Sequence, residues 1–155
     1  MPDESYGDKY QGSPAEPVVE ELAEAECLHL VAGQQVGRIA FTGRFGLAVV
    51  PVNYRLHEGR IVFRTGQGSP MDEDLRTGLE HAEYQVAFEV DQFDPGTRQA
   101  WSVLIHGPAH HVRSDQERAT AAGSGVTPWA SGSKEQYIQV VPTRITGRRI
   151  RQPGG

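Results

Sequence analysis

The stretch VPVNYRLHEGRIVFRTGQGSP, residues 50–70, decides the fold of this chain. Two runs rich in β-branched and aromatic residues flank a turn at Glu58-Gly59, a pattern that predicts a β-hairpin. The second run opens into small, polar residues from Thr65 to Ser69. Glycines let backbone N–H groups approach an anion closely, and hydroxyls donate hydrogen bonds to it. The hairpin therefore ends in either a simple loop or a cradle for a phosphate.

The residues after this loop predict a short helix. Ser69 is a good N-cap, and Pro70 suits the first helical position because that position needs no N–H. Asp72 is spaced to complete a capping box with Ser69, and we expect the helix to reach about Leu79. Arg64, just before the loop, can offer a bidentate phosphate contact. Strand alternation places its side chain on the opposite face from that of the next residue.

Strands dominate the rest of the chain. The predicted strands are 36–42, 47–56, 60–65, 84–91 and 99–112, with one or two more within 135–150. Apolar residues at helical spacing predict a helix over 18–32, and we expect a short helix at 114–122 before a loop at 123–134. Consecutive short strands with few helices are typical of a closed antiparallel barrel. The expected interior residues are Phe41, Val49, Phe63, Val86, Phe88, Val103, Ile105 and Ile138.

Length and charge limit the function classes. The chain has 155 residues and a formal net charge of -5, which suits one domain. We expect a disordered tail over 1–17, a globular domain over 18–150 and a flexible end over 151–155. The acidic balance disfavours nucleic acid as a partner. No apolar run reaches the roughly 20 residues that cross a bilayer, so we predict a cytoplasmic protein without membrane contact.

Motifs for metal binding and side-chain catalysis are weak. His106 and His110 on one strand would lie about 13 Å apart, too far for one ion to bridge, so we predict no metal site. Cys27 is the only cysteine, which excludes an internal disulfide, and we expect it to be a small buried apolar residue. The loop at 65–69 lacks the lysine of a Walker loop, and no Ser-His-Asp signature is present.

Several spaced motifs carry a resemblance to a known family. In chain order they are Gly37–Phe41 (GRIAF), Pro51–Tyr54 (PVNY), Gly59–Thr65 (GRIVFRT), Phe88–Asp91 (FEVD), Trp101–Val103 (WSV) and Val141–Gly147 (VPTRITG). This order is similar to that of the pyridoxamine 5'-phosphate oxidase-like flavin-binding split barrels. The match covers roughly residues 20–150, and several motifs in order are far stronger evidence than any one alone.

The resemblance implies a mainly β fold, a six-stranded antiparallel split β-barrel with a few short flanking helices. It also implies a homodimer with FMN bound between the subunits, and a two-electron reaction on an unknown small molecule. The flavin would carry the electrons, which explains why no acid, base or nucleophile motif is needed. We expect no true pyridoxamine phosphate oxidase activity, because no second basic cluster suits a substrate phosphate.

The same resemblance implies three groups of cofactor-binding residues. Those expected along the isoalloxazine ring, chiefly through backbone groups, are Val50, Pro51, Val52 and Asn53. Those expected around the phosphate are Arg64, Thr65, Gly68 and Ser69. Trp101 and Ser102 are expected near the cofactor, with either subunit as their source.

One position departs from the family pattern. Relatives commonly have a lysine shortly after the Gly-Ser pair, where this chain has Pro70, followed by Met71, Asp72, Glu73 and Asp74. Three carboxylates here would repel a phosphate, and one lost charged hydrogen bond weakens binding about ten- to a hundredfold. Two alternatives therefore stay open. The barrel uses a deazaflavin coenzyme instead of FMN, or it has lost its cofactor and serves as a non-catalytic binding protein.

Overall fold

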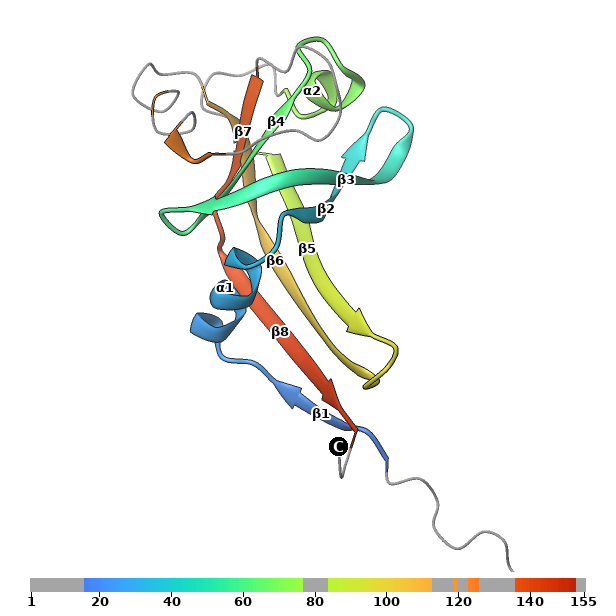
Figure 1. Cartoon of the computed structure of the whole chain (residues 1–155). Helices are drawn as coiled ribbons and strands as arrows, with labels where there is room; N and C mark the ends of the chain where they lie inside the picture. Colours follow the sequence, from blue (N-terminus) through green and yellow to red (C-terminus); the bar gives the residue numbers. More distant parts are fainter. Residues whose placement is uncertain (1–15, 77–83, 113–118, 120–122, 126–135, 153–155) are drawn as a thin grey trace, which may run out of the picture.

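A computed structural model of the chain describes residues 16–76, 84–112, 119, 123–125 and 136–152. Figure 1 shows long strands with the short helices α1 and α2 beside them. The strands are β1 (Val18–Glu21), β2 (Val36–Gly43), β3 (Gly46–His57), β4 (Arg60–Thr65), β5 (Tyr84–Asp94), β6 (Gln99–His111), β7 (Gln136–Val140) and β8 (Arg144–Arg151). The helices are α1 (Glu24–Ala32) and α2 (Pro70–Asp74). The predicted strands are confirmed, and β5 continues past its predicted end at Asp91.

Six of the strands close into an antiparallel barrel. Their order around it is β6, β5, β2, β3, β4 and β7, and β7 pairs again with β6. Each neighbouring pair runs antiparallel. Closure pairs strand edges that would otherwise be open to other chains. The predicted six-stranded split barrel with few helices is confirmed.

The split lies on β6, which changes partner along its length. Its residues 100–106 pair with β8, and its residues 109–111 pair with β7. Gly107 lies between the two ladders, and a Cβ there would overlap the backbone carbonyl of Val141. The segment that links β7 to β8 therefore crosses directly over Gly107. We call the following segments the arm: β1, β8, residues 100–106 of β6, and the part of β5 that pairs with those residues of β6.

The arm contains a strand that the sequence did not predict. Residues 18–21 form β1 and the helix begins only at Glu24, so the prediction of one helix from Val18 is wrong. β1 lies antiparallel to β8, and Glu20 forms a salt bridge of 3.3 Å with Arg151. Pairing with a strand at the other end of the chain thus overrides local helical spacing.

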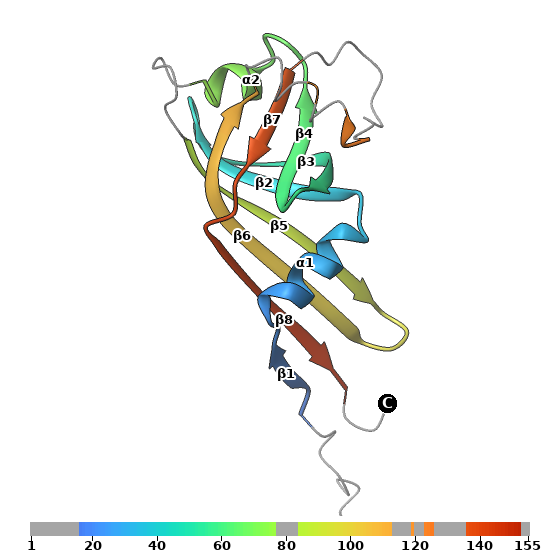
Figure 2. The ribbon, with the colours of Figure 1, turned by 90° about the vertical axis from the view of Figure 1, so that its left-hand side faces the viewer.

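α1 covers one face of the arm (Figure 2). Its inward residues Cys27 and Val31 are fully buried. A Cβ at Gly147 of β8 would lie 2.6 Å from the sulfur of Cys27, so only glycine lets the helix approach β8 this closely. Burial raises the pKa of the Cys27 thiol. The prediction that Cys27 is a buried apolar residue is confirmed.

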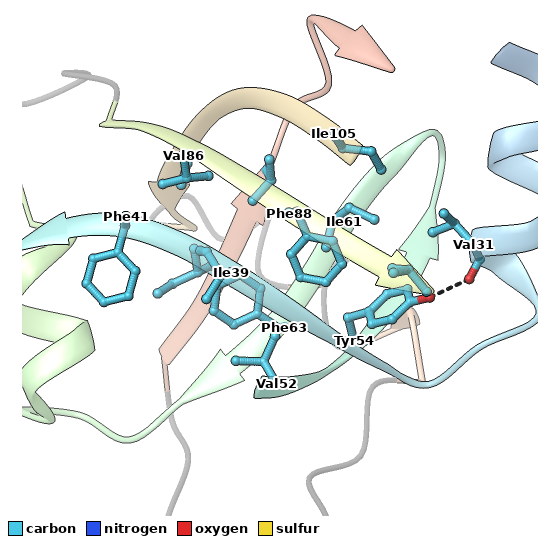
Figure 3. Close-up of a cluster of buried hydrophobic side chains, with 14 of the residues drawn as sticks. Val31, Ile39, Phe41, Val52, Tyr54, Ile61, Phe63, Val86, Phe88 and Ile105 are labelled. Atoms are coloured by element: carbon cyan, nitrogen blue, oxygen red, sulfur yellow. Dashed lines mark hydrogen bonds between the residues drawn. The ribbon is translucent and has the colours of Figure 1, made fainter. Parts of the chain in front are cut away.

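Side chains of α1 and of the strands pack together in the interior of the barrel (Figure 3). The rings of Tyr54 and Phe88 pack edge to face, with centroids 5.1 Å apart. The Tyr54 hydroxyl donates a hydrogen bond of 2.6 Å to the Val31 carbonyl of α1. Burial raises the pKa of Tyr54, so this hydroxyl keeps its proton and continues to donate.

Seven of the eight predicted interior residues are buried. They are Phe41, Phe63, Val86, Phe88, Val103, Ile105 and Ile138. Val49 is the exception, because its side chain is 65% exposed. Alternation along β3 puts Val49 on the outside of the barrel, on the same face as Leu47.

α2 is shorter than the sequence predicts. It ends at Asp74 with Leu75 as its C-cap, so the prediction of a helix to about Leu79 is wrong. Ser69 is confirmed as the N-cap, because its hydroxyl accepts a hydrogen bond of 3.1 Å from the Asp72 N–H. Leu75 is 2% exposed and packs with the interior residues, so α2 covers one end of the barrel.

Other predictions fall largely outside the described residues. These are the tail over 1–17, the helix at 114–122, the loop at 123–134 and the end over 151–155, although β8 includes Arg151. Within the part of the chain that is described, no helix is long and apolar enough to span a membrane.

Candidate functional site

β3 and β4 separate before β4 ends. Their ladder runs from the pair His57 and Arg60 to the pair Tyr54 and Phe63. β4 then continues along β7, while β3 continues along β2 (Figure 1). The edge of β3 at residues 50–53 therefore faces the opening where the two strands diverge.

The loop from Thr65 to Ser69 begins at this opening. The two hydroxyl oxygens of Thr65 and Ser69 lie 2.9 Å apart, and Ser69 also accepts from the Asp72 N–H. Whichever hydroxyl donates to the other, one hydroxyl hydrogen of the pair is left for a ligand. Gly68 has a φ of +74°, and a Cβ on it would meet no atom within 4 Å. The loop therefore leaves open space over Gly68.

Asp72 is a buried carboxylate against the inner side of the loop, with 1% of its side chain exposed. The Gly68 N–H donates to its Oδ2 at 2.7 Å, and His111 Nε2 lies 2.6 Å from its Oδ1. Arg76 Nη2 lies 3.3 Å from both oxygens. Burial by itself raises the pKa of Asp72, but the Gly68 N–H, His111 and Arg76 outweigh it and lower the pKa below its usual value. The predicted capping box therefore closes on Gly68 instead of Ser69, and this amide is already engaged.

The acidic start of α2 carries less uncompensated charge than the sequence indicates. Arg44 donates to Asp74 at 2.7 Å and to Glu73 at 3.0 Å. Asp72 in turn faces Arg76. Opposite charges at these distances largely cancel each other's field beyond the pair. Most of the charge that we expected to repel a phosphate is therefore neutralised.

The strand expected along the flavin ring presents two faces. Val52 is buried and Val50 packs against the barrel interior. Pro51 is exposed and pairs with Arg38 of β2 on the outside of the barrel, and alternation puts Asn53 on that same outer side. The backbone of all four residues lies along the opening between β3 and β4.

Trp101 and Ser102 lie in the arm, on opposite faces of β6. Trp101 packs against the interior residues, and its indole N–H donates to Gln92 at 3.3 Å. Ser102 faces outward and pairs with Asp91 of β5. Three strand spacings, about 14 Å, separate Ser102 from Asn53 across the sheet. Within one chain, the fold therefore does not bring Ser102 next to Asn53.

The outside of β2, β3, β5 and β6 combines exposed apolar residues with one charged cluster. Leu47 is 88% exposed. Arg38 lies 3.3 Å from Glu89 and 3.1 Å from Asp91. Burial, together with the neighbouring Asp91 carboxylate, raises the pKa of Glu89 to about 7 despite Arg38. We call this surface the outer face; its residues are Arg38, Ala40, Leu47, Val49, Pro51, Asn53, Ala87, Glu89, Asp91, Ser102 and Leu104.

Sequence reasoning missed the roles of His111 and Arg76. His111 shares the inward face of β6 with Val103 and Ile105, and a buried histidine at such a position needs a polar partner. The alternation of buried residues along β6 could have predicted that His111 points inward, but it does not identify Asp72 as the partner of His111. For Arg76, the signal was its spacing of four residues from Asp72.

His106 and His110, which we predicted to be too far apart to share a metal ion, both lie on β6. Among the described residues, no group of three or more histidine, cysteine, aspartate and glutamate side chains is arranged to hold a metal ion.

The sequence pattern matches one family of known proteins. The model of this family, described as pyridoxamine 5'-phosphate oxidase, matches residues 23–149. An uncharacterised protein of Mycobacterium tuberculosis is 33% identical over 132 residues, which cover 85% of this chain and 86% of that protein. The matched region includes α1, the whole barrel and most of the arm.

Solved structures share the fold of this chain. The FAD-binding protein from Mycobacterium smegmatis is 30% identical and superposes with a TM-score of 0.71, covering 85% of this chain and 100% of its own. A FAD-binding protein from Mesorhizobium loti superposes with a TM-score of 0.67 over 87% of this chain and 98% of its own. At 19% identity, this second protein shows a likeness of fold alone.

Proposed function

This chain belongs to the pyridoxamine 5'-phosphate oxidase family, and we propose that it is a homodimeric flavin-binding oxidoreductase that acts on a small molecule. FMN is the flavin that we propose, held between two copies of the chain. The observation that carries the proposal is the divergence of β3 and β4. It puts the edge of one strand, at residues 50–53, beside a loop with a hydroxyl hydrogen to donate.

The opening suits the two polar ends of a flavin. A ring with several nitrogen and oxygen atoms is matched by backbone groups along a strand edge, and a phosphate is matched by hydroxyl and guanidinium donors. Arg64 lies at the end of β4, where its guanidinium stacks 5.5 Å from the centre of the Tyr137 ring. Thr65 is 2% exposed and Ser69 is more accessible, so Ser69 presents the hydroxyl pair to the ligand.

The chain's own part in the reaction is to bind, orient and exclude water. When bound, the flavin supplies two-electron chemistry at its ring. Residues 50–53 would hold the ring, and the loop would hold the phosphate. Arg38, Glu89 and Asp91 give the neighbouring surface a group that exchanges a proton near neutral pH, because the pKa of Glu89 is raised to about 7.

The outer face is the surface that we propose for the second copy. Leu47 and Val49 are exposed side by side with Pro51 on one strand. An exposed apolar patch of this kind marks a protein contact more often than free surface. A symmetric dimer would cover the patch on both chains. We propose that Ser102, which lies three strands from Asn53 of its own chain, contacts the flavin bound by the other chain.

The test is a visible absorbance spectrum of the purified protein, followed by titrations with FMN, riboflavin and the deazaflavin coenzyme. We expect saturable FMN binding by the native chain. Thr65→Val keeps the shape of the side chain but removes its hydroxyl, and we expect it to weaken FMN binding about tenfold. Thr97→Ala is the control, because its hydroxyl lies in the β5–β6 turn, where it accepts a hydrogen bond from the nearby Gln99 N–H.

Each other outcome selects a different function. Saturation by the deazaflavin coenzyme alone would replace FMN with that coenzyme. If no flavin bound, the proposal would fail, and the barrel would be a non-catalytic binding protein. The engagement of the Gly68 amide by Asp72 is the observation that favours this last alternative.

A further inference from the structure

The contacts of Asp72 bring a second arginine to the loop. The Gly68 N–H and Arg76 Nη2 both lie within hydrogen-bonding distance of the same carboxylate oxygen, Oδ2, at 2.7 and 3.3 Å. The Arg76 guanidinium and the Gly68 amide are therefore bridged by one carboxylate oxygen. This places a guanidinium on the carboxylate that already holds the Gly68 amide of the loop.

The position of Arg76 is fixed from the buried side. His111 lies 2.6 Å from the other oxygen of Asp72, and its side chain is 3% exposed. The carboxylate is thus held between β6 and the loop, and its orientation determines where Nη2 lies. A charged hydrogen bond to a fixed, buried acceptor restricts a flexible side chain more than a surface pair does.

Within the part of the chain that the structure describes, most of the Arg76 guanidinium has no partner. A guanidinium has five N–H donors in a rigid fork, and only Nη2 is bonded to Asp72. Among the described residues, Arg76 Nε and Nη1 have no hydrogen-bond partner. The side chain is 41% exposed, so a ligand can reach Arg76 from the solvent side.

We propose that Arg76 is the cation that contacts the phosphate ester of the ligand, and that Asp72 is the residue that positions it. The inference rests on the proposed function, since it assigns a partner to the phosphate at the same loop. It also gives the site guanidinium N–H donors, which Pro70 and the engaged Gly68 amide do not provide. The Asp72 carboxylate accepts the Gly68 N–H, which is then no longer available to a ligand, and it also binds the Arg76 guanidinium.

The test compares FMN with riboflavin, because the two differ only in the phosphate. We expect Arg76→Gln to weaken FMN binding about ten- to a hundredfold and to leave riboflavin binding unchanged. Arg76→Lys should restore part of the loss, because it returns the charge without the fork. Arg98→Gln, at the tip of the β5–β6 hairpin, changes the net charge equally and should leave both affinities unchanged. FAD is a second probe, and an equal loss for FAD assigns the contact to the phosphate that both flavins share.

The positioning role of Asp72 has its own test. Asp72→Asn keeps the shape but removes the charge that holds Arg76. We expect it to reduce the preference for FMN over riboflavin, and we expect no further reduction when Arg76→Gln is added. A rise in that preference would overturn positioning and make Asp72 a competing anion.

The results separate this inference from the proposed function. If the native chain binds FMN and Arg76→Gln binds it equally well, Arg76 does not contact the phosphate, while the proposed function stands. If the native chain binds no flavin, both are wrong. Unchanged riboflavin affinity in each variant shows that the barrel is still folded.

Discussion

The barrel and the arm share β6, but each buries its side chains in a different way. In the barrel, strands from all sides fill one interior, and Tyr54, Phe63 and Phe88 are at most 1% exposed. In the arm, α1 covers one face of the sheet, and Leu104, on the opposite face, is 36% exposed. The interior of the barrel is therefore filled within one chain, whereas the outer face leaves apolar side chains exposed, and this is why we propose it as the contact with a second copy. The junction between the barrel and the arm is Gly107.

Adding one methyl group at that junction should have the largest effect. Gly107→Ala places a Cβ against the Val141 carbonyl, and neither backbone can move without breaking a ladder. We expect a loss of more than about 4 kcal/mol, measured by thermal unfolding and by the yield of folded protein. In Gly33→Ala the nearest atom is 3.6 Å away, and this control should change stability by less than about 1 kcal/mol. Equal melting of the two variants would contradict the crossing over Gly107.

Within the barrel, the next largest effect is expected at its most enclosed ring. Phe88→Ala removes a fully buried ring that packs against Tyr54, so we expect a loss of about 3–5 kcal/mol in urea unfolding. Phe93 lies on the same strand where β5 extends into the arm, and it is 65% exposed. Phe93→Ala should stay within about 0.5 kcal/mol of the native chain. Similar losses would mean that the arm is packed as tightly as the barrel.

On the open side, assembly should change while the stability of the single chain does not. Val49→Asp puts a charge into the centre of the exposed apolar residues, and we expect it to convert a dimer into a monomer in sedimentation experiments. Val49→Thr, which keeps the branched shape, should remain a dimer. A native chain that is monomeric at all concentrations would show that the outer face is not an interface between copies.

The smallest effect is expected from the charged cluster of the outer face. The pKa of Glu89 in the fold is about 7, against 4.5 for an ordinary glutamate. Between these two values the unfolded chain loses its proton first, so stability should fall as the pH rises from about 4.5 to about 7 and then level off. Glu89→Gln should remove this slope, and the measurement is urea unfolding across that range. A slope that is unchanged in the variant would assign it to another group.

The fold was predictable from the sequence because its signals are local. Alternation of apolar residues identified β2 to β6, and the spaced motifs identified the barrel that they form. Two errors have a shared cause. The sequence predicted Val49 to lie in the interior because both faces of β3 carry apolar residues there. The two-residue alternation of a strand does not show which of two apolar faces is enclosed. β1 was read as helix because its partner, β8, lies at the other end of the chain.

The site was predictable only in outline. Thr65, Gly68 and Ser69 mark the loop because small and hydroxyl residues follow a strand. The engagement of Asp72 was not predictable, since it depends on His111, 39 residues away and on another strand. A carboxylate in the first turn of a helix is usually exposed. Only the packing of β6 against the loop makes Asp72 a buried, hydrogen-bonded acceptor.

Because Cys27 lies close against Gly147, its thiol can report when α1 separates from β8. The thiol is shielded by β8 and its pKa is raised, so a thiol reagent reaches it only when α1 lifts from the arm. As the single cysteine, it gives an unambiguous signal. Its rate of alkylation in the absence of denaturant therefore measures how often the arm releases its helix, separately from unfolding of the barrel. If a second copy binds the opposite face of the arm, the alkylation rate of Cys27 should fall. The same rate would then also report dimer formation.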